Sequence, residues 1–284
     1  MNSKNKSILS LHIAVMLFGL AGVIGKLVTM PAVILTFFRV TFSSVFLLLV
    51  LMGKKEKLRL SSLGDYLWFG IAGILMAVHW TTFLQSVQMS TVAIGTITFS
   101  VFPLFVTFLE PLVYHEKLRG RDVAAAAVMF AGVLITVPEF SLRNQMTAGI
   151  LVGLLSALSY AGLCLMNRSF SGRYQGMVIC LYEQGIAAAV LLPVCLSRPV
   201  ALSAKDLAWA AFLGVICTAI AHSIYVGSLR RVKVQTAGII SGMETVYGIL
   251  FAAVFLREIP GIRELAGGAV ILGTVLYSTL FHCR

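Results

Sequence analysis

Charged residues are scarce in this sequence of 284 residues. Asp, Glu, Lys and Arg together make up 12% of it, whereas hydrophobic residues make up 59%. Soluble domains carry about 25% charged residues, which keep their surface solvated. The composition therefore excludes a soluble domain, and the polar segments between the apolar runs are too short to form a catalytic domain outside a membrane.

Cysteine is scarce as well, because the chain has five and none of them form a Cys-x-x-Cys pair. Four lie inside apolar runs, where cysteine is typically a small packing residue. Neither a disulfide framework nor a zinc site is predicted. The sequence also lacks Walker and dinucleotide-binding motifs and any Ser-His-Asp arrangement. We therefore expect no metal, no cofactor and no enzymatic activity.

Long apolar runs are abundant, and each can cross a hydrocarbon core of about 30 Å as a helix. Ten spans are predicted, at residues 8–28, 32–52, 63–85, 92–114, 122–138, 148–167, 177–196, 207–229, 235–256 and 263–281. The predicted fold class is an all-α integral membrane protein with ten transmembrane helices. Lys4 and Lys6 precede the first run, as in a signal peptide. That run has the length of a full span and lacks a clear cleavage site, so we expect a retained helix.

The two halves of the chain repeat each other at an offset of about 142 residues. The offset relates Phe18 to Tyr160, Trp80 to His222, Phe83 to Tyr225, and Glu116 to Glu258, which each close an apolar run. A unit of five spans must insert its second copy in the opposite orientation, because five is odd. We therefore predict two inverted five-helix repeats, at residues 1–142 and 143–284, which is the architecture of secondary transporters.

Lysine and arginine are distributed unevenly among the predicted loops. With the N-terminus inside the cell, fifteen fall on the inner side and six on the outer side, and Arg39 is left within the membrane. Because cytoplasmic loops retain Lys and Arg, both termini are predicted to be cytoplasmic, in a multi-pass protein of the plasma (inner) membrane. The asymmetry and anionic lipid at the inner surface account for the net charge of +11. The basic residues occupy short loops, so the expected partner is the lipid bilayer and no nucleic acid.

Several short segments carry a resemblance to a known family, and two of those in the second half occupy the places of two in the first. They are Phe18-Gly19-Leu20 with Lys26, Thr91-Val92-Ala93, Phe102-Pro103-Leu104-Phe105, Gln235-Thr236-Ala237 and Glu244-Thr245-Val246. With the two repeats, they resemble the EamA family of the drug/metabolite transporter superfamily, although Phe18 stands where the family has Trp and Thr245 where proline is usual. The resemblance implies a transporter whose central cavity is lined by the first, third and fourth helices of each half. It leaves the substrate open among amino acids, amines, nucleotide-like metabolites and drugs.

The expected lining helices carry the candidate substrate-binding residues. Trp80 and Phe83 share one face of the third span, as His222 and Tyr225 do in its repeat. Glu244 lies near the bilayer centre on a face with small residues, where a carboxylate must be protonated, paired or in contact with water. The predicted pathway residues are Phe18, Trp80, Phe83, Tyr160, His222, Tyr225, Ser241 and Glu244. Packing remains the alternative for the aromatic residues, and internal hydrogen bonding the alternative for His222 and Glu244.

Arg39 and Glu183 occupy nearly equivalent places in the second helix of each half. Because the resemblance implies that these helices stand further from the cavity, we expect a structural or gating ion pair between the two residues. A role in substrate binding is the alternative.

The pattern as a whole predicts a secondary-active carrier that works by alternating access, with a proton as the candidate coupling ion. Aromatic rings around one carboxylate suit a cationic or zwitterionic amine. Efflux of amino acids or amine-type compounds is the function that the resemblance favours. Uptake of a quaternary amine such as choline is one alternative, and a membrane interaction protein without transport is another. Either a monomer or a homodimer is compatible with the sequence.

Overall fold

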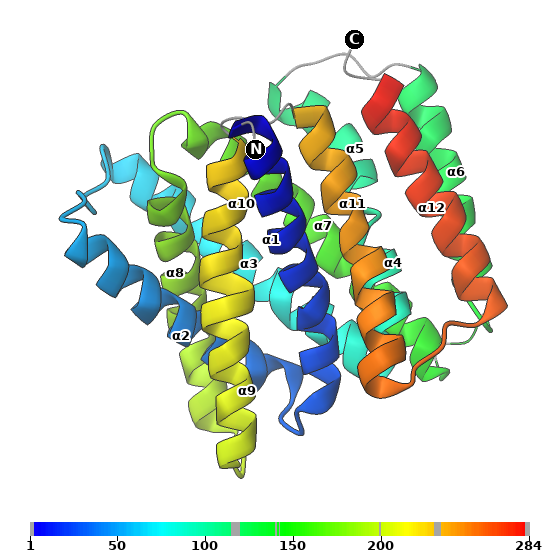
Figure 1. Ribbon diagram of the computed structural model, residues 1–284, viewed down its shortest axis with the longest axis horizontal. Helices are drawn as coiled ribbons and strands as arrows, with labels where there is room; N and C mark the ends of the chain where they lie inside the picture. The colour runs from blue at the N-terminus through cyan, green and yellow to red at the C-terminus, as the bar shows by residue number, and fades with distance from the viewer. Residues whose placement is uncertain are drawn as a thin grey trace.

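The computed structural model describes residues 3–114, 120–139, 141, 143–198, 200–229 and 234–281, without the side chains of residues 3–7, 122, 226–239 and 278–281. In these ranges the chain is helical and contains no strand (Figure 1). The helices are α1 (Ser3–Leu27), α2 (Ala32–Gly53), α3 (Leu63–Met89), α4 (Val92–Phe99), α5 (Phe102–Tyr114), α6 (Gly120–Thr136), α7 (Gln145–Ser171), α8 (Gly176–Ser197), α9 (Ala204–Gly214), the π-helix η1 (Val215–Ile220), α10 (Ala221–Leu229), α11 (Val234–Phe251), the π-helix η2 (Ala252–Leu256) and α12 (Ile262–Phe281).

Within the described residues, seven helical segments are long and apolar enough to cross a membrane. They are Ile8–Leu27, Ala32–Gly53, Leu63–Met89, Val92–Tyr114, Gln145–Ser171, Gly176–Ser197 and Ala204–Tyr225. Two shorter apolar helices, Val123–Thr136 and Ile240–Leu256, fall inside further predicted spans. The protein is thus a multi-pass membrane protein, and the count of ten crossings stays a prediction. Glu116, the predicted repeat partner of Glu258, lies outside the described residues.

Polar residues in the connections cap the N-termini of several helices. The side chains of Ser62, Thr91 and Ser203 each accept a hydrogen bond from the backbone N–H three residues later, at distances of 3.0–3.1 Å. Such caps satisfy N–H groups that have no acceptor within the helix. Asn144 does the same for α7, through the backbone N–H groups of Met146 and Thr147. These caps fix where the spans start at the polar ends of the bundle.

The span predicted at 92–114 is interrupted rather than continuous. Ser100 and Val101 separate α4 from α5, and Pro103 is the second residue of α5. Proline has no N–H, so Pro103 cannot donate to the carbonyl of Phe99, and its ring fits only the first turn of a new helix. The structure keeps the predicted bounds of this span, Val92–Tyr114, and divides it into two helices at Ser100 and Val101.

Helices of the two halves pack extensively against each other. The broadest contacts join α3 to α7, α6 to α12, α2 to α8 and α1 to α11. At one of them Gly19 of α1 lies directly against α11, where an added Cβ would sit 2.8 Å from the Gly248 nitrogen and 2.9 Å from the Glu244 carbonyl oxygen. A glycine is required for this approach of two backbones. Each half therefore depends on the other for burial.

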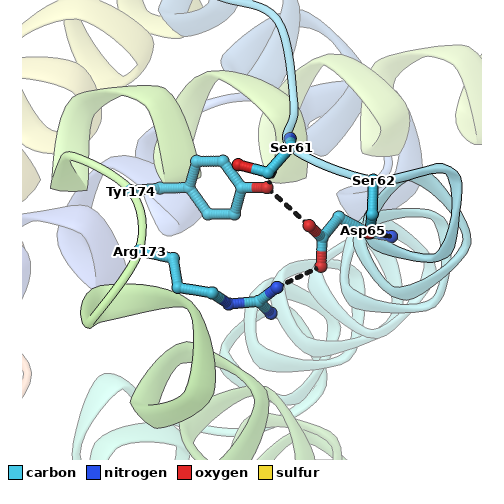
Figure 2. Close-up of polar contacts among 5 residues, drawn as sticks. All are labelled: Ser61, Ser62, Asp65, Arg173 and Tyr174. Carbon is cyan, nitrogen blue, oxygen red and sulfur yellow. Dashed lines mark hydrogen bonds and ion pairs between the residues drawn. The ribbon is translucent and has the colours of Figure 1, made fainter.

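The start of α1 and the end of α12 lie at the same end of the bundle, which we call the terminal end (Figure 1). There, the first turn of α3 is tied to the connection between α7 and α8 (Figure 2). The Asp65 carboxylate accepts hydrogen bonds of 2.6 Å from Arg173 and from the Tyr174 hydroxyl. The Tyr174 hydroxyl also accepts a hydrogen bond of 2.8 Å from the Ser61 backbone N–H. We call the opposite end of the bundle the far end.

Candidate functional site

A cavity of about 470 Å³ lies between helices of both halves. This volume is within the range of about 300–1,000 Å³ that is typical of small-molecule sites. All eight residues that the sequence predicts for the pathway line it: Phe18 (α1), Trp80 and Phe83 (α3), Tyr160 (α7), His222 and Tyr225 (α10), and Ser241 and Glu244 (α11). The structure therefore gathers these residues in one place, and whether they bind a substrate stays a prediction.

Aromatic rings form much of the cavity wall. The ring of Phe18 lies 4.7 Å from that of His222 and 5.8 Å from that of Tyr225, measured between centroids. The Tyr225 hydroxyl shares a hydrogen bond of 2.9 Å with the Ser241 hydroxyl, which links α10 to α11 beside Glu244. Such a wall offers flat apolar surfaces and π-faces to a bound cation.

The break between α4 and α5 also contributes to the cavity, which sequence reasoning missed. Phe99, Ser100 and Phe102 line it, and the rings of Phe99 and Phe102 lie 5.1 and 4.9 Å from the ring of Tyr160. Ser100 shares a hydrogen bond of 2.6 Å with Thr245, the neighbour of Glu244. Pro103 in the sequence indicates an interruption there, and this feature could have pointed to the site.

His79 has two kinds of contact in the structure. It lines the cavity, and its Nδ1 lies 2.8 Å from the Ser156 hydroxyl oxygen of α7. Its side chain is 4% exposed. His79 is therefore both a cavity residue and a contact between α3 and α7, at an interface that joins the two halves.

Arg39 and Glu183 do not form the expected ion pair in this structure. Arg39 donates from Nε to the Thr218 hydroxyl at 2.7 Å, and its guanidinium carbon lies 3.9 Å from the centroid of the Trp80 ring. Arg39 lines the cavity, whereas Glu183 is not among the lining residues. Asn167 of α7 is the polar side chain that faces Glu183 instead. Both side chains are buried, each in its own surroundings.

Arg39 lies on the buried face of α2 and lines the cavity, although the second helices were expected to stand away from it. The buried residues of α2 include Ala32, Leu35, Arg39, Ser43 and Leu47, which recur at helical spacing. The polar side chains of Thr36, Arg39 and Ser43 recur on this stripe, and all three are buried. The stripe carries Arg39 inward, and the expectation that second helices stand clear of the cavity is wrong for this residue.

Polar contacts close the far end of the bundle beyond the cavity. The Gln88 side chain donates to the carbonyl oxygens of Gly25 at 3.2 Å and Met30 at 3.1 Å. The Lys26 ammonium donates to the carbonyl oxygen of Ser90. These contacts tie the end of α1 to the end of α3.

Two carboxylates extend this closure to the start of α4. Glu258 accepts a hydrogen bond of 2.5 Å from the Val92 backbone N–H, and Glu264 accepts one of 2.9 Å from the Thr91 hydroxyl. Burial raises the pKa of the Glu258 carboxyl above its ordinary value, and the charge of Glu264 acts in the same direction. The Val92 N–H and Lys26 oppose that rise. The cavity is therefore separated from the far end by a layer of hydrogen bonds.

No group of three or more His, Cys, Asp or Glu residues that could hold a metal ion occurs among the described residues. The free cysteines described are Cys164, Cys180, Cys195 and Cys217. Of these, Cys164 lines the cavity.

Comparison with known proteins gives a consistent result along the chain. The model of the EamA-like transporter family matches residues 5–137 and 147–280. An uncharacterized transporter of Archaeoglobus fulgidus is 26% identical over 69% of this chain and 70% of its own. The pseudopaline exporter CntI of Pseudomonas aeruginosa is 25% identical, over 86% of this chain and 84% of its own. An S-adenosylmethionine uptake transporter of Rickettsia conorii is 25% identical, over 85% of this chain and 80% of its own.

A solved crystal structure has the same fold. It superposes with a TM-score of 0.68 at 17% sequence identity, and the match covers 99% of this chain and 98% of that one. At this identity the likeness concerns the fold alone.

Proposed function

Because the chain belongs to the EamA-like transporter family, we propose that it is a secondary-active transporter that moves a small metabolite across the plasma membrane by alternating access. The observation that carries the proposal is the cavity of about 470 Å³, which collects ionisable and aromatic residues of both halves. Ionisable residues inside a membrane typically mark a substrate or ion pathway. Membership of a transporter family also implies that the protein is not an enzyme.

The closure of the far end supports alternating access. Hydrogen bonds at Gln88, Thr91 and Val92 hold one side of the cavity closed, so these contacts must break when that side opens. In the predicted orientation the far end faces outward and both termini are cytoplasmic. The conformation would then be one with the outer side closed.

The proposed substrate is an amino acid or an amine-type compound, and the proposed direction is efflux coupled to protons. Glu244 is half-buried at the cavity wall, where its carboxylate can attract an ammonium group or carry a proton. The relatives named above include an exporter and an uptake transporter, so the family is compatible with either direction. Uptake of a quaternary amine such as choline is the second candidate, because the rings of Phe18 and Tyr160 line the cavity.

The test is a ligand-binding screen followed by a transport assay. The purified protein would be melted in detergent with amino acids, polyamines and quaternary amines, since a ligand that binds only the folded state raises the melting temperature. We expect amino acids or amines to raise it, and the same compounds to move across proteoliposomes under a pH gradient. A folded protein that binds and transports none of them would contradict the proposal and favour an interaction protein without transport. Net inward movement of choline without amino-acid transport would favour the second candidate.

A further inference from the structure

The guanidinium of Arg39, a residue that lines the cavity, has an unused hydrogen-bonding capacity. Its side chain is 3% exposed, and its Nη1 atom is buried without any hydrogen-bond partner. An arginine side chain has five N–H donors and remains charged in proteins. A buried guanidinium without a carboxylate is costly unless something pairs with it. Arg39 therefore presents a cation that the protein itself leaves incompletely satisfied.

The surroundings of Arg39 hold the guanidinium in one orientation. Thr218 accepts the Nε hydrogen bond at 2.7 Å, and the Trp80 ring lies under the guanidinium at 3.9 Å. Thr218 belongs to the π-helix η1, where its own hydroxyl donates to the carbonyl of Leu213, five residues earlier, at 2.8 Å. Such a π-helical turn is a local distortion that often occurs at functional sites. Gly214 also lets this segment approach the backbone of α2, because an added Cβ would lie 2.5 Å from the Arg39 carbonyl oxygen.

The carboxylates of the protein do not complete this site. Glu183 is not in ion-pair contact with Arg39 and does not line the cavity. Glu244 lines the same cavity and is near enough to act on Arg39 electrostatically. No ion pair within the described residues joins Arg39 to Glu244. One cavity thus offers a fixed cation and an anion that do not satisfy each other directly.

We propose that Arg39 binds a carboxylate group of the substrate while Glu244 binds its ammonium group, so that the cavity takes zwitterions such as α-amino acids in preference to amines without a carboxylate. This inference rests on the proposed function and narrows its substrate class. A guanidinium pairs with a carboxylate through parallel N–H donors, which gives such pairs both strength and a defined geometry. The face of Trp80 towards Arg39 is already occupied by the guanidinium, which leaves that face unavailable to a quaternary amine.

The experiment compares ligands that differ only in the carboxylate. Dissociation constants would be measured on the purified full-length protein for a panel of L-α-amino acids and for the amine derived from each by removal of the carboxylate. Glycine betaine and choline would be compared as a separate pair, because both carry a quaternary ammonium. We expect the zwitterion to bind about 10- to 100-fold more tightly than its matched amine, as for a charge-assisted hydrogen bond.

Variants test whether Arg39 is the residue that makes the protein prefer a zwitterion to its matched amine. In Arg39→Gln the ratio between zwitterion and amine should fall towards one, and amine binding should strengthen because a repelling cation is removed. Arg39→Lys keeps the charge without the planar fork and should give an intermediate ratio. Arg59→Gln removes an equal charge from the exposed connection between α2 and α3 and serves as the matched control. Thr218→Val keeps Arg39 but removes the hydroxyl that accepts the hydrogen bond from its Nε. This variant should also lower the ratio between zwitterion and amine binding.

Three outcomes separate this inference from the proposed function. A wild-type ratio near one, with clear amine binding, would overturn the role of Arg39 while the transporter proposal stands. The role of Arg39 is likewise overturned if Arg39→Gln or Thr218→Val melts like the wild type and keeps the full ratio. If a folded wild-type protein binds neither members of the panel nor the betaine and choline pair, the proposed function itself fails. If Arg39→Gln does not fold, the wild-type ratio and Thr218→Val still decide the question.

Discussion

At the scale of single residues, Glu244 is the group on which proton coupling depends. It lies on α11 at the cavity wall, and it is flanked there by the polar pairs Tyr225–Ser241 and Ser100–Thr245. A carboxylate in this position can exchange a proton only if the cavity brings it into contact with water. Its ionisation, rather than its shape, is therefore what the transport cycle would use.

The first prediction is that Glu244→Gln abolishes transport driven by a pH gradient. Glutamine keeps the size and the hydrogen-bonding capacity of the side chain but cannot ionise. Expression and melting temperature should stay near those of the wild type, and substrate binding should weaken and lose its dependence on pH. Uptake of labelled substrate into proteoliposomes, with and without a gradient, measures the effect. Normal transport with an unchanged pH response would move the coupling site elsewhere, with His222 as the first candidate.

Arg39 and Glu183 lead to the second prediction, which differs from the expectation from sequence. Because the two side chains are not in contact here, their effects on stability should be independent. In a double-mutant cycle of Arg39→Gln and Glu183→Gln, the interaction energy should be below about 0.5 kcal/mol, as for residues without shared partners. Thermal or denaturant unfolding in detergent measures the stabilities of the wild type, the two single variants and the double variant. A coupling of about 1 kcal/mol or more would mean that the pair forms in another conformation of the cycle, as a gate.

At the scale of helices, the close contact between α1 and α11 positions the helix that carries Glu244. Gly19→Ala would place a methyl group 2.8 Å from the Gly248 nitrogen, which the backbone cannot accommodate without a shift of the helix. We predict a loss of about 1–3 kcal/mol in stability, as for overpacked sites, together with impaired transport. Gly70→Ala in α3 is the matched control, since an added Cβ there meets no atom within 4 Å. Equal melting temperatures for the two variants would show that the α1–α11 contact is not as tight as described.

The closure of the far end gives a prediction about pH. Burial raises the pKa of Glu258, so folding favours its protonated form. A carboxyl with a raised pKa contributes stability that is complete below its ordinary pKa and is lost as the pH rises through the raised value. Glu258→Gln, which resembles the protonated form, should match the wild-type melting temperature in acid and exceed it increasingly towards neutral pH. A constant difference between the two proteins across this range would show that Glu258 does not titrate with folding.

The helices were also the features that the sequence predicted best, for physical reasons. The boundaries of the spans follow from the alternation of apolar runs and polar connections, in which capping residues such as Ser62 and Ser203 occur. The repeat offset brought Trp80, His222 and Tyr225 together as candidates, and they line one cavity. The inward position of Arg39 was not predicted, although Thr36, Arg39 and Ser43 form a polar stripe on the face of α2 that is buried. Arg39 was expected at the periphery because the family resemblance implies that the second helices stand further from the cavity.

At the scale of the whole molecule, orientation in the membrane is the property on which the direction of transport depends. The start of α1 and the end of α12 lie at the same end of the bundle (Figure 1). This arrangement requires an even number of crossings, and the excess of Lys and Arg predicts that the shared end is cytoplasmic. The connection between α2 and α3, which contains Lys55, belongs to the same end. The connection that contains Arg198, between α8 and α9, belongs to the far end.

The last prediction therefore concerns topology. A reporter fused after Arg284 and another inserted near Lys55 should both report the cytoplasm, and a third inserted near Arg198 should report the outer side. The third position is the control, because a reporter that gives a cytoplasmic response at every site carries no information on orientation. An outer response at Lys55 or Arg284 would overturn both the charge argument and the inverted arrangement of the halves. It would also reverse the closure at Glu258 from the outer to the inner side, and with it the conformation assigned to this structure.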